Sequence, residues 1–175
     1  GGFFDYRAAA HPGGGLLHER ARELADQVEK APTIRVFTSA AMTGAYHDNL
    51  ITAVQQGDDD DPFDSRYLQI RAGAMVAATG CIERPLPFEN NEKPGVMQVG
   101  CAHRLARTWG LMPGEKIAFS VGHDLGLEAA LDLAELGGRV VCVADIREDG
   151  QDPALVAALA DRRIPYFKGW VAAEA

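Results

Sequence analysis

The chain has 175 residues, of which 47% are hydrophobic and 24% charged, a composition typical of globular protein with one sizeable core or two small ones. Its formal net charge of -8, without any Lys/Arg cluster, argues against nucleic acid and an acidic membrane surface as partners. The three cysteines are scattered, so we expect no disulfide framework and favour a reduced, cytoplasmic setting. The five histidines lack metal-ligand spacing, which argues against a metal site. No apolar run reaches the roughly 20 residues that a membrane helix needs.

The first part of the chain predicts a helix and a strand. It opens with Gly1-Gly2-Phe3-Phe4 and no initiator Met, which suits an internal fragment of a longer protein. A short β-branched strand is expected over 33–37. Before it, apolar residues recur at steps of three and four and predict an amphipathic helix over 16–30, with Leu17, Ala21, Leu24 and Val28 on one face.

Antiparallel strands are predicted next. Residues 45–56 and 66–72 alternate as strands, and the four adjacent aspartates between them form a solvated hairpin tip rather than a calcium loop. Residues 74–80 form a small apolar run, which predicts a buried strand that ends in a turn. The three prolines within 81–96 predict a long rigid connection.

The second half of the chain predicts one βαβ-type unit with a parallel sheet. A helix over 99–110 comes first. A strand, a helix and a strand follow at 116–121, 125–136 and 139–145, and then a helix over 153–162 and a short strand over 165–168. The expected fold class is therefore α/β, with one domain over 1–96 and a second over 97–175.

The turn after the strand at 116–121 is where a Rossmann unit carries G-x-G-x-x-G. Gly126 matches the third glycine, which allows close packing of helix on strand, whereas Val121 and His123 stand at the first two glycine positions. Asp145 ends the next strand, at the place of the acidic residue that binds ribose hydroxyls. The hypothesis is a dinucleotide site that includes Gly122, Gly126 and Asp145, and the alternative is a purely structural Rossmann unit.

Two side chains in this turn bear on that choice. Asp124 places a carboxylate where a pyrophosphate would lie, and like charges repel each other. His123 could donate a hydrogen bond to a phosphate, although an exposed loop histidine is the simpler interpretation. The scaffold of a dinucleotide-binding unit is therefore predicted, with a damaged phosphate-binding turn.

A more specific pattern lies upstream, over 78–97: ATG-x-x-ERPL-x-F-x-N-N-x-x-PGVM. It resembles the alpha subunit of heterotetrameric sarcosine oxidase and the alpha-type subunits of proline dehydrogenase, opine dehydrogenase and hydrogen cyanide synthase. The stretches at 46–49 and 112–116 are similar to the same family. The second Rossmann-like unit of that family also lacks the glycine fingerprint, as the turn at Val121 and His123 does.

The resemblance implies a three-layer ββα FAD/NAD(P)-binding domain, present as a fragment without its first βαβ unit and interrupted by an inserted Rossmann-like βαβ unit. Thr79 and Gly80 would lie beside the first dinucleotide, NAD or FAD. Gly1 and Gly2 would also lie beside it, although a competing register uses the glycines at 13–15. Glu83 and Arg84 would be structural parts of the connection between the domains, or a local ion pair.

The function implied by the resemblance is that of the dinucleotide-binding portion of a flavin-dependent amine oxidoreductase acting on CH–NH groups, inactive alone and joined to other subunits of a hetero-oligomer. Substrate oxidation in sarcosine oxidases belongs to the beta subunit, so no catalytic residue is assigned here. Two alternatives stay open. An NAD(P)H-dependent flavoprotein of the pyridine nucleotide–disulfide oxidoreductase type would need an intact second glycine turn, whereas a non-catalytic scaffold or interaction module would not.

Overall fold

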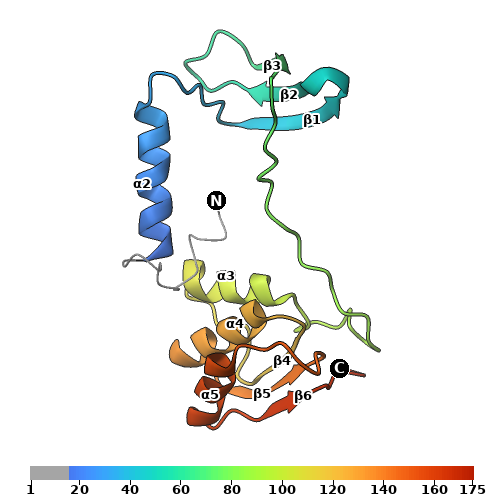
Figure 1. The fold of residues 1–175 in the computed structure, drawn as a ribbon. Helices are drawn as coiled ribbons and strands as arrows, with labels where there is room; N and C mark the ends of the chain where they lie inside the picture. The colour runs from blue at the N-terminus through green and yellow to red at the C-terminus, as the bar shows by residue number, and fades with distance from the viewer. Residues whose placement is uncertain (1–15) are drawn as a thin grey trace. The chain divides into compact units, whose positions relative to one another are not determined.

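The computed structural model describes residues 16–175, and these divide into two compact units (Figure 1). One unit comprises Glu19–Cys81, and the other includes Ile82–Ala175. The first holds a three-stranded antiparallel sheet and the second a three-stranded parallel sheet. The predicted α/β class is confirmed. The three-layer ββα arrangement, the inserted unit and the domain boundary at residue 96 stay predictions.

The first unit consists of one helix and an antiparallel meander. The helix forms where the apolar periodicity predicts it, but none of its side chains is buried. The strands pair in chain order, and Gln55 on the central strand is buried. Its amide Nε2 donates to the carbonyl of Thr38 at 2.9 Å, and its Oε1 accepts from Arg66. The elements are α2 (Leu17–Lys30), β1 (Ala40–Tyr46), β2 (Leu50–Gln56) and β3 (Ser65–Arg71).

The two connections in this meander differ in length: β1 and β2 are joined by three residues, and β2 and β3 by the longer loop 57–64. The strand predicted over 45–56 is in fact the end of β1 and all of β2, separated by the 3-10 turn η1 (His47–Asn49). Asp48 and Asn49 adopt positive φ values of 58° and 50°, a conformation that Asp and Asn tolerate better than most residues, so the chain reverses there. The predicted hairpin tip lies between β2 and β3, and Asp58 and Asp61 hydrogen-bond within it.

Two predicted strands are wrong. The segment at 33–37 is irregular and leaves Ile34 49% and Val36 46% exposed. The segment at 74–80 is irregular too, and Val76 is 92% exposed rather than buried. A strand needs a neighbour for its backbone hydrogen bonds, and neither segment joins one of the two sheets in the described part of the chain.

The second unit is a βαβαβ arrangement with its strands in the order β4-β5-β6. The strands pair in parallel, as the sequence predicts. Helices α4 and α5 are the crossovers, and α3 packs against α4. The core lies between helices and sheet, where Leu127, Leu133, Val143 and Leu159 are fully buried. The elements are α3 (Val99–Trp109), β4 (Ile117–Val121), α4 (Asp124–Glu135), β5 (Val140–Asp145), α5 (Pro153–Asp161) and β6 (Tyr166–Lys168).

Helix ends in this unit follow local sequence signals. Helix α3 ends at Gly110, which adopts the left-handed φ of 65°. Helix α5 begins after Asp152, whose carboxylate accepts from the backbone N–H of Ala154, and Pro153 occupies the first turn. These signals explain why both boundaries lie within a residue of their predicted positions.

The proline-rich connection before α3 pairs with the last residues of the chain. Glu89 forms an isolated parallel bridge with Glu174. The N–H of Glu89 donates to the carbonyl of Ala173 at 3.0 Å, and the Lys93 ammonium donates to the carbonyl of Ala175 at 2.8 Å. These bonds attach the connection to the second unit at Glu89 and Lys93.

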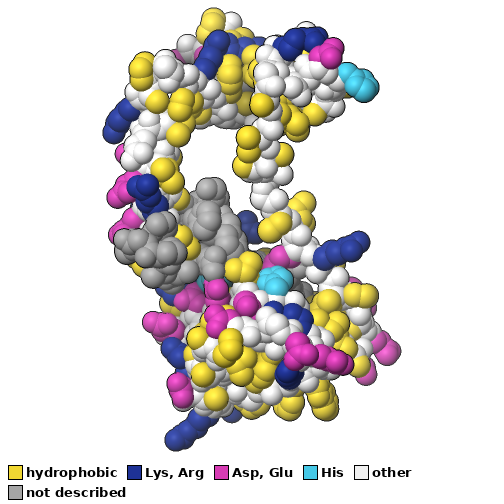
Figure 2. Space-filling model, viewed as in Figure 1, with side chains coloured by type: hydrophobic (Ala, Val, Ile, Leu, Met, Phe, Trp, Pro, Cys, Tyr) yellow, Lys and Arg dark blue, Asp and Glu magenta, His cyan; other side chains and the backbone are white. Residues whose placement is uncertain are grey.

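The surface carries both signs of charge interspersed with apolar side chains on the face shown in Figure 2. Within residues 16–175, no helix combines the length and apolar character needed to cross a membrane.

Candidate functional site

The candidate site lies at the carboxyl edge of the parallel sheet, where β4, β5 and β6 end at Val121, Asp145 and Lys168. In open α/β sheets, ligands bind in the crevice outside these strand ends. Three of the residues predicted to bind a cofactor are here: Gly122, Gly126 and Asp145. The site can therefore be tested against the shape and charge of a dinucleotide.

The turn between β4 and α4 packs helix against strand. A Cβ added to Gly126 would lie 2.6 Å from Cγ1 and 2.7 Å from Cβ of Val121, so only glycine fits at this crossing. The packing role predicted for Gly126 is confirmed. Gly122 is different, because a Cβ there would meet only Ile146 Cγ2 at an ordinary 3.5 Å. No contact with the rest of the described protein therefore requires glycine at position 122.

Asp145 is fully buried and fully engaged by protein groups. Its Oδ1 accepts from the backbone N–H and from Nε of Arg147, both at 3.0 Å. Its Oδ2 accepts from Nη2 of Arg147 at 2.7 Å and from the hydroxyl of Tyr166 at 3.1 Å. A carboxylate offers about four acceptor positions, and four donors from these two residues already fill them.

The guanidinium of Arg147 also reaches the start of α4. Its Nη2 donates to Oδ1 of Asp124 at 2.9 Å. The same oxygen lies 3.4 Å from the backbone N of Asp152, the residue that caps α5. Asp124, Asp145, Arg147 and Tyr166 therefore form one network across the strand ends, called the carboxyl-edge network below.

The network shifts the titration of its members. Burial raises the pKa of Asp145, but hydrogen bonds from Arg147 and Tyr166 outweigh it and hold this pKa below its ordinary value. Burial and the hydrogen bond to Asp145 raise the pKa of Tyr166 to about 12. The pKa of Arg147 is raised, chiefly by its hydrogen bond to Asp145. At neutral pH the network holds two carboxylates, one guanidinium and a neutral phenol, a formal charge of -1.

These residues fit a bound dinucleotide poorly. A ribose would have to displace Arg147 to reach Asp145, and a pyrophosphate at the start of α4 would meet Asp124. His123 provides no side-chain hydrogen bond to the helix start that it precedes. Binding by Gly122, Gly126 and Asp145 stays a prediction, and the network in this structure opposes it.

The other predicted site residues lie elsewhere. Thr79 and Gly80 end an exposed, irregular segment before the connection, and Thr79 belongs with Gly80 to the unit Glu19–Cys81. Gly80 has a φ of 76°, and a Cβ there would meet no described atom within 4 Å. Gly1 and Gly2, and the competing glycines at 13–15, fall outside the described residues. Their role beside a dinucleotide stays a prediction.

Sequence reasoning missed the partners of Asp145. Arg147 stands two residues after the strand-end aspartate, which is a signal that could have been noticed. Tyr166 comes from the next strand, so only the strand order brings its hydroxyl to Asp145. A second missed group joins α3 to α4: His103 and Arg107, one helical turn apart, both contact Asp132.

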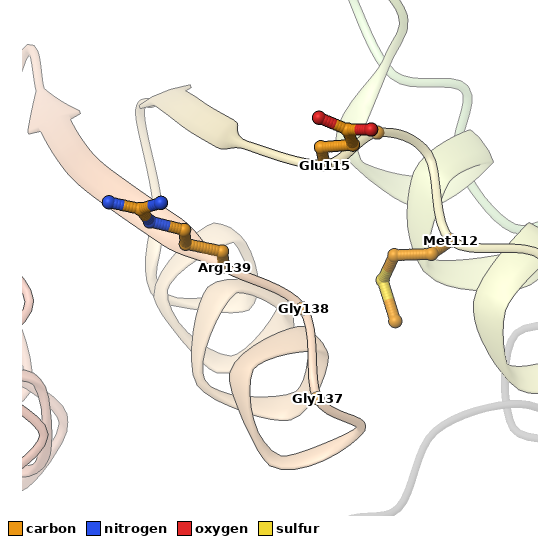
Figure 3. A pocket seen from close by; sticks show the side chains of 6 residues that line it. Met112, Glu115, Gly137, Gly138 and Arg139 are labelled. Carbon is orange, nitrogen blue, oxygen red and sulfur yellow. The ribbon is translucent and has the colours of Figure 1, made fainter.

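The amino edge of the same sheet carries an open pocket of about 450 Å³ (Figure 3). Its lining lies in the loops before β4 and β5, and the Met112 side chain extends toward Gly137 and Gly138. Glu115 and Arg139 supply one charge of each sign at its rim. Among the described residues, no group of His, Cys, Asp and Glu is placed to hold a metal ion.

Comparison with curated proteins gives three similar relatives, each named sarcosine oxidase subunit alpha. Identity to the Rhizobium meliloti (strain 1021) protein is 31% over 78% of this chain. Identity to the Corynebacterium sp. (strain P-1) protein is 34% over 82% of this chain, and to the Corynebacterium sp. (strain U-96) protein 32% over 78%. The predicted resemblance is confirmed. The chain spans 16% of the length of each relative. No protein-family model matches the chain.

Two solved structures share the fold. The L-proline dehydrogenase from P. horikoshii matches 86% of this chain and 30% of its own, with a TM-score of 0.63 at 22% identity. The NAD-dependent persulfide reductase from A. fulgidus matches 82% of this chain and 27% of its own, with a TM-score of 0.56 at 19% identity. At these identities, the two likenesses speak for the fold alone.

Proposed function

We propose that this chain is the dinucleotide-binding portion of a flavin-dependent amine oxidoreductase of the sarcosine oxidase alpha type. The observation that carries the proposal is the 31–34% identity to three sarcosine oxidase alpha subunits over about four fifths of the chain. The motif over 78–97 and the βαβ unit add support. The cofactor is NAD or FAD, and the partners are the other subunits of a hetero-oligomer.

In this proposal the chain supplies binding and orientation, and the flavin supplies the hydride chemistry. We infer that Thr79 and Gly80 lie beside the dinucleotide. The φ of 76° at Gly80 suits a position that only glycine adopts at little cost. We assign oxidation of the amine to another subunit and name no catalytic acid or base in this chain.

The alternative that a specific observation favours is a scaffold role for the second unit. Its parallel sheet ends in the carboxyl-edge network rather than in a glycine-rich phosphate turn. A pyridine nucleotide–disulfide oxidoreductase-like function would need that turn, and Val121 and His123 replace its first two glycines.

Calorimetric titration of the chain with FAD, NAD and NADP tests the proposal. We expect saturable binding of FAD or NAD, and no flavin reduction by sarcosine without a partner subunit. The variant Gly80→Val should weaken binding by roughly tenfold or more, equivalent to about 1.4 kcal/mol. Its matched control is Gly73→Val, seven residues upstream, where a Cβ meets no described atom within 4 Å and φ is not left-handed.

Two results would count against this function. The first is no heat with any of the three dinucleotides, which would leave a non-catalytic scaffold. The second is equal binding by Gly80→Val and Gly73→Val, which would remove the segment Ala78–Gly80 from the site.

A further inference from the structure

We infer that the carboxyl edge of the β4-β5-β6 sheet is occupied by the protein's own Arg147, which closes it to dinucleotides. The inference rests on the proposed function only in placing dinucleotide binding elsewhere, at Thr79 and Gly80. It begins from the position of the guanidinium, which lies between the end of β5 and the start of α4. Those two chain ends are where a Rossmann unit holds ribose and pyrophosphate.

The hydrogen bonds of Arg147 show how completely the place is filled. The guanidinium donates through Nε and Nη2 to both oxygens of Asp145, a bidentate pair of the kind that fixes geometry as well as energy. Nη2 also donates to Asp124, so one side chain ties two segments together. The Arg147 side chain is 21% exposed and Asp145 is 0% exposed, so water competes little for these bonds.

Displacing Arg147 would leave a buried carboxylate without its cation. A ribose offers neutral hydroxyls to Asp145, and neutral donors bond a carboxylate about half as strongly as a guanidinium does. A phosphate would bring negative charge to a network that already carries a formal charge of -1. Both parts of a dinucleotide therefore bind less well here than Arg147 does.

The glycines do not offset this cost. Gly126 is used for packing against Val121, with a Cβ-to-Cγ1 separation of 2.6 Å if a side chain were added. Gly122 is not one of the fingerprint glycines, and Val121 and His123 stand at the positions of the tight-turn glycine and of the glycine that approaches the pyrophosphate. The turn is shaped by helix packing, and Arg147 already pairs with both carboxylates at its mouth without a ligand.

Site-resolved NMR on the full chain tests the closed edge. We expect the amide signals of Gly122 and Ile146 and the Arg147 Nε–H signal to stay unmoved during titration with NAD, NADP and ADP-ribose. Saturable shifts at these three positions would overturn the inference. The result is separate from the calorimetry, because binding at Gly80 would give heat without moving these signals.

Hydrogen exchange tests whether Arg147 holds the edge. The amide of Gly169 donates to the carbonyl of Arg147 at 3.2 Å, and that of Ile146 to Val121 at 3.0 Å. In Arg147→Lys, a single ammonium cannot replace the bidentate fork, so both amides should exchange roughly tenfold faster, as loss of a charged hydrogen bond predicts. The matched control is Arg139→Lys, which changes an exposed arginine directly before β5. Equal exchange in the two variants would overturn the inference.

Discussion

At the scale of single residues, Gly126 shows how one missing side chain sets the distance between a helix and a strand. Alanine is the better helix former by about 1 kcal/mol. At this position, however, its Cβ would lie 2.6 Å and 2.7 Å from two atoms of Val121. Overpacking of a well-packed core costs roughly 1–3 kcal/mol. Because the overpacking cost exceeds the gain in helix propensity, replacing Gly126 with alanine should destabilise the fold.

We therefore predict that Gly126→Ala lowers the free energy of unfolding by about 1 kcal/mol, measured by urea denaturation. Gly122→Ala is the control, because its Cβ would meet Ile146 at an ordinary 3.5 Å. When Val121→Ala is already present, adding Gly126→Ala should lower the free energy of unfolding by less than it does in the parent protein. A Gly126→Ala protein as stable as the parent would contradict this account of the turn.

The two signals at this turn differ in how far they could be predicted from the sequence. The packing role of Gly126 depends on a strand, a turn and a helix that follow one another, so spacing alone predicts it. The state of Asp145 depends on Tyr166, which is 21 residues away and reaches it only through strand order. A strand-end aspartate predicts a ribose ligand equally well whether or not an arginine already fills its oxygens.

At the scale of secondary-structure elements, α3 is capped from a distance. Its own N-cap residue, Gln98, makes no side-chain hydrogen bond to the helix end. Instead, both carboxylate oxygens of Glu83 accept from the backbone N–H of Gly100, at 3.0 Å and 2.8 Å. The Gln98 side chain donates back to the Glu83 carbonyl at 2.8 Å. The structural role predicted for Glu83 is thus a helix cap, and a carboxylate there also suits the helix dipole.

We predict that Glu83→Ala lowers the free energy of unfolding by about 1 kcal/mol, the usual cost of a lost cap. Glu83→Gln keeps an acceptor oxygen but loses the charge, so its loss should be smaller. Glu92→Ala, an exposed residue of the same connection, is the control. Thermal unfolding of the four proteins gives the order, and a Glu83→Ala protein matching Glu92→Ala would rule out the cap.

Elements whose signals lie in their own sequence can be predicted from it, whereas a segment that forms a strand only beside a suitable neighbouring strand cannot. The helices and the parallel strands have apolar patterns in their own sequence, and α5 adds a local N-cap and α3 a glycine at its end. The segments at 33–37 and 74–80 have β-branched or small apolar residues, but residue type does not specify a neighbouring strand. The single strand predicted over 45–56 overlooks three consecutive polar residues, His47–Asn49, which interrupt the alternation. Asp48 and Asn49 reverse the chain there.

At the scale of the whole molecule, charged groups inside the second unit make its stability depend on pH. Asp132 on α4 accepts hydrogen bonds from Arg107 on α3 and lies 2.6 Å from Nε2 of His103. Burial raises the pKa of Asp132, but hydrogen bonds from Arg107 and His103 outweigh it and lower this pKa to about 2. The pKa of Asp145 is lowered as well. Two helices and three strand ends thus depend on ionised carboxylates.

The sign of the resulting pH dependence follows from these lowered values. An aspartate whose pKa is lower in the folded state stabilises the fold above its unfolded pKa of about 4, and this stabilisation is lost as the pH falls toward the folded pKa. We predict that the second unit loses about 2 kcal/mol between about pH 5 and pH 2 from Asp132 alone, measured by urea unfolding at each pH. Asp132→Asn should be less stable near neutral pH but show a shallower acid loss. Asp149→Asn, which removes a 95% exposed partner of Lys168, is the control and should keep the full acid slope. An unchanged slope in Asp132→Asn would show that the contact between α3 and α4 does not set acid stability.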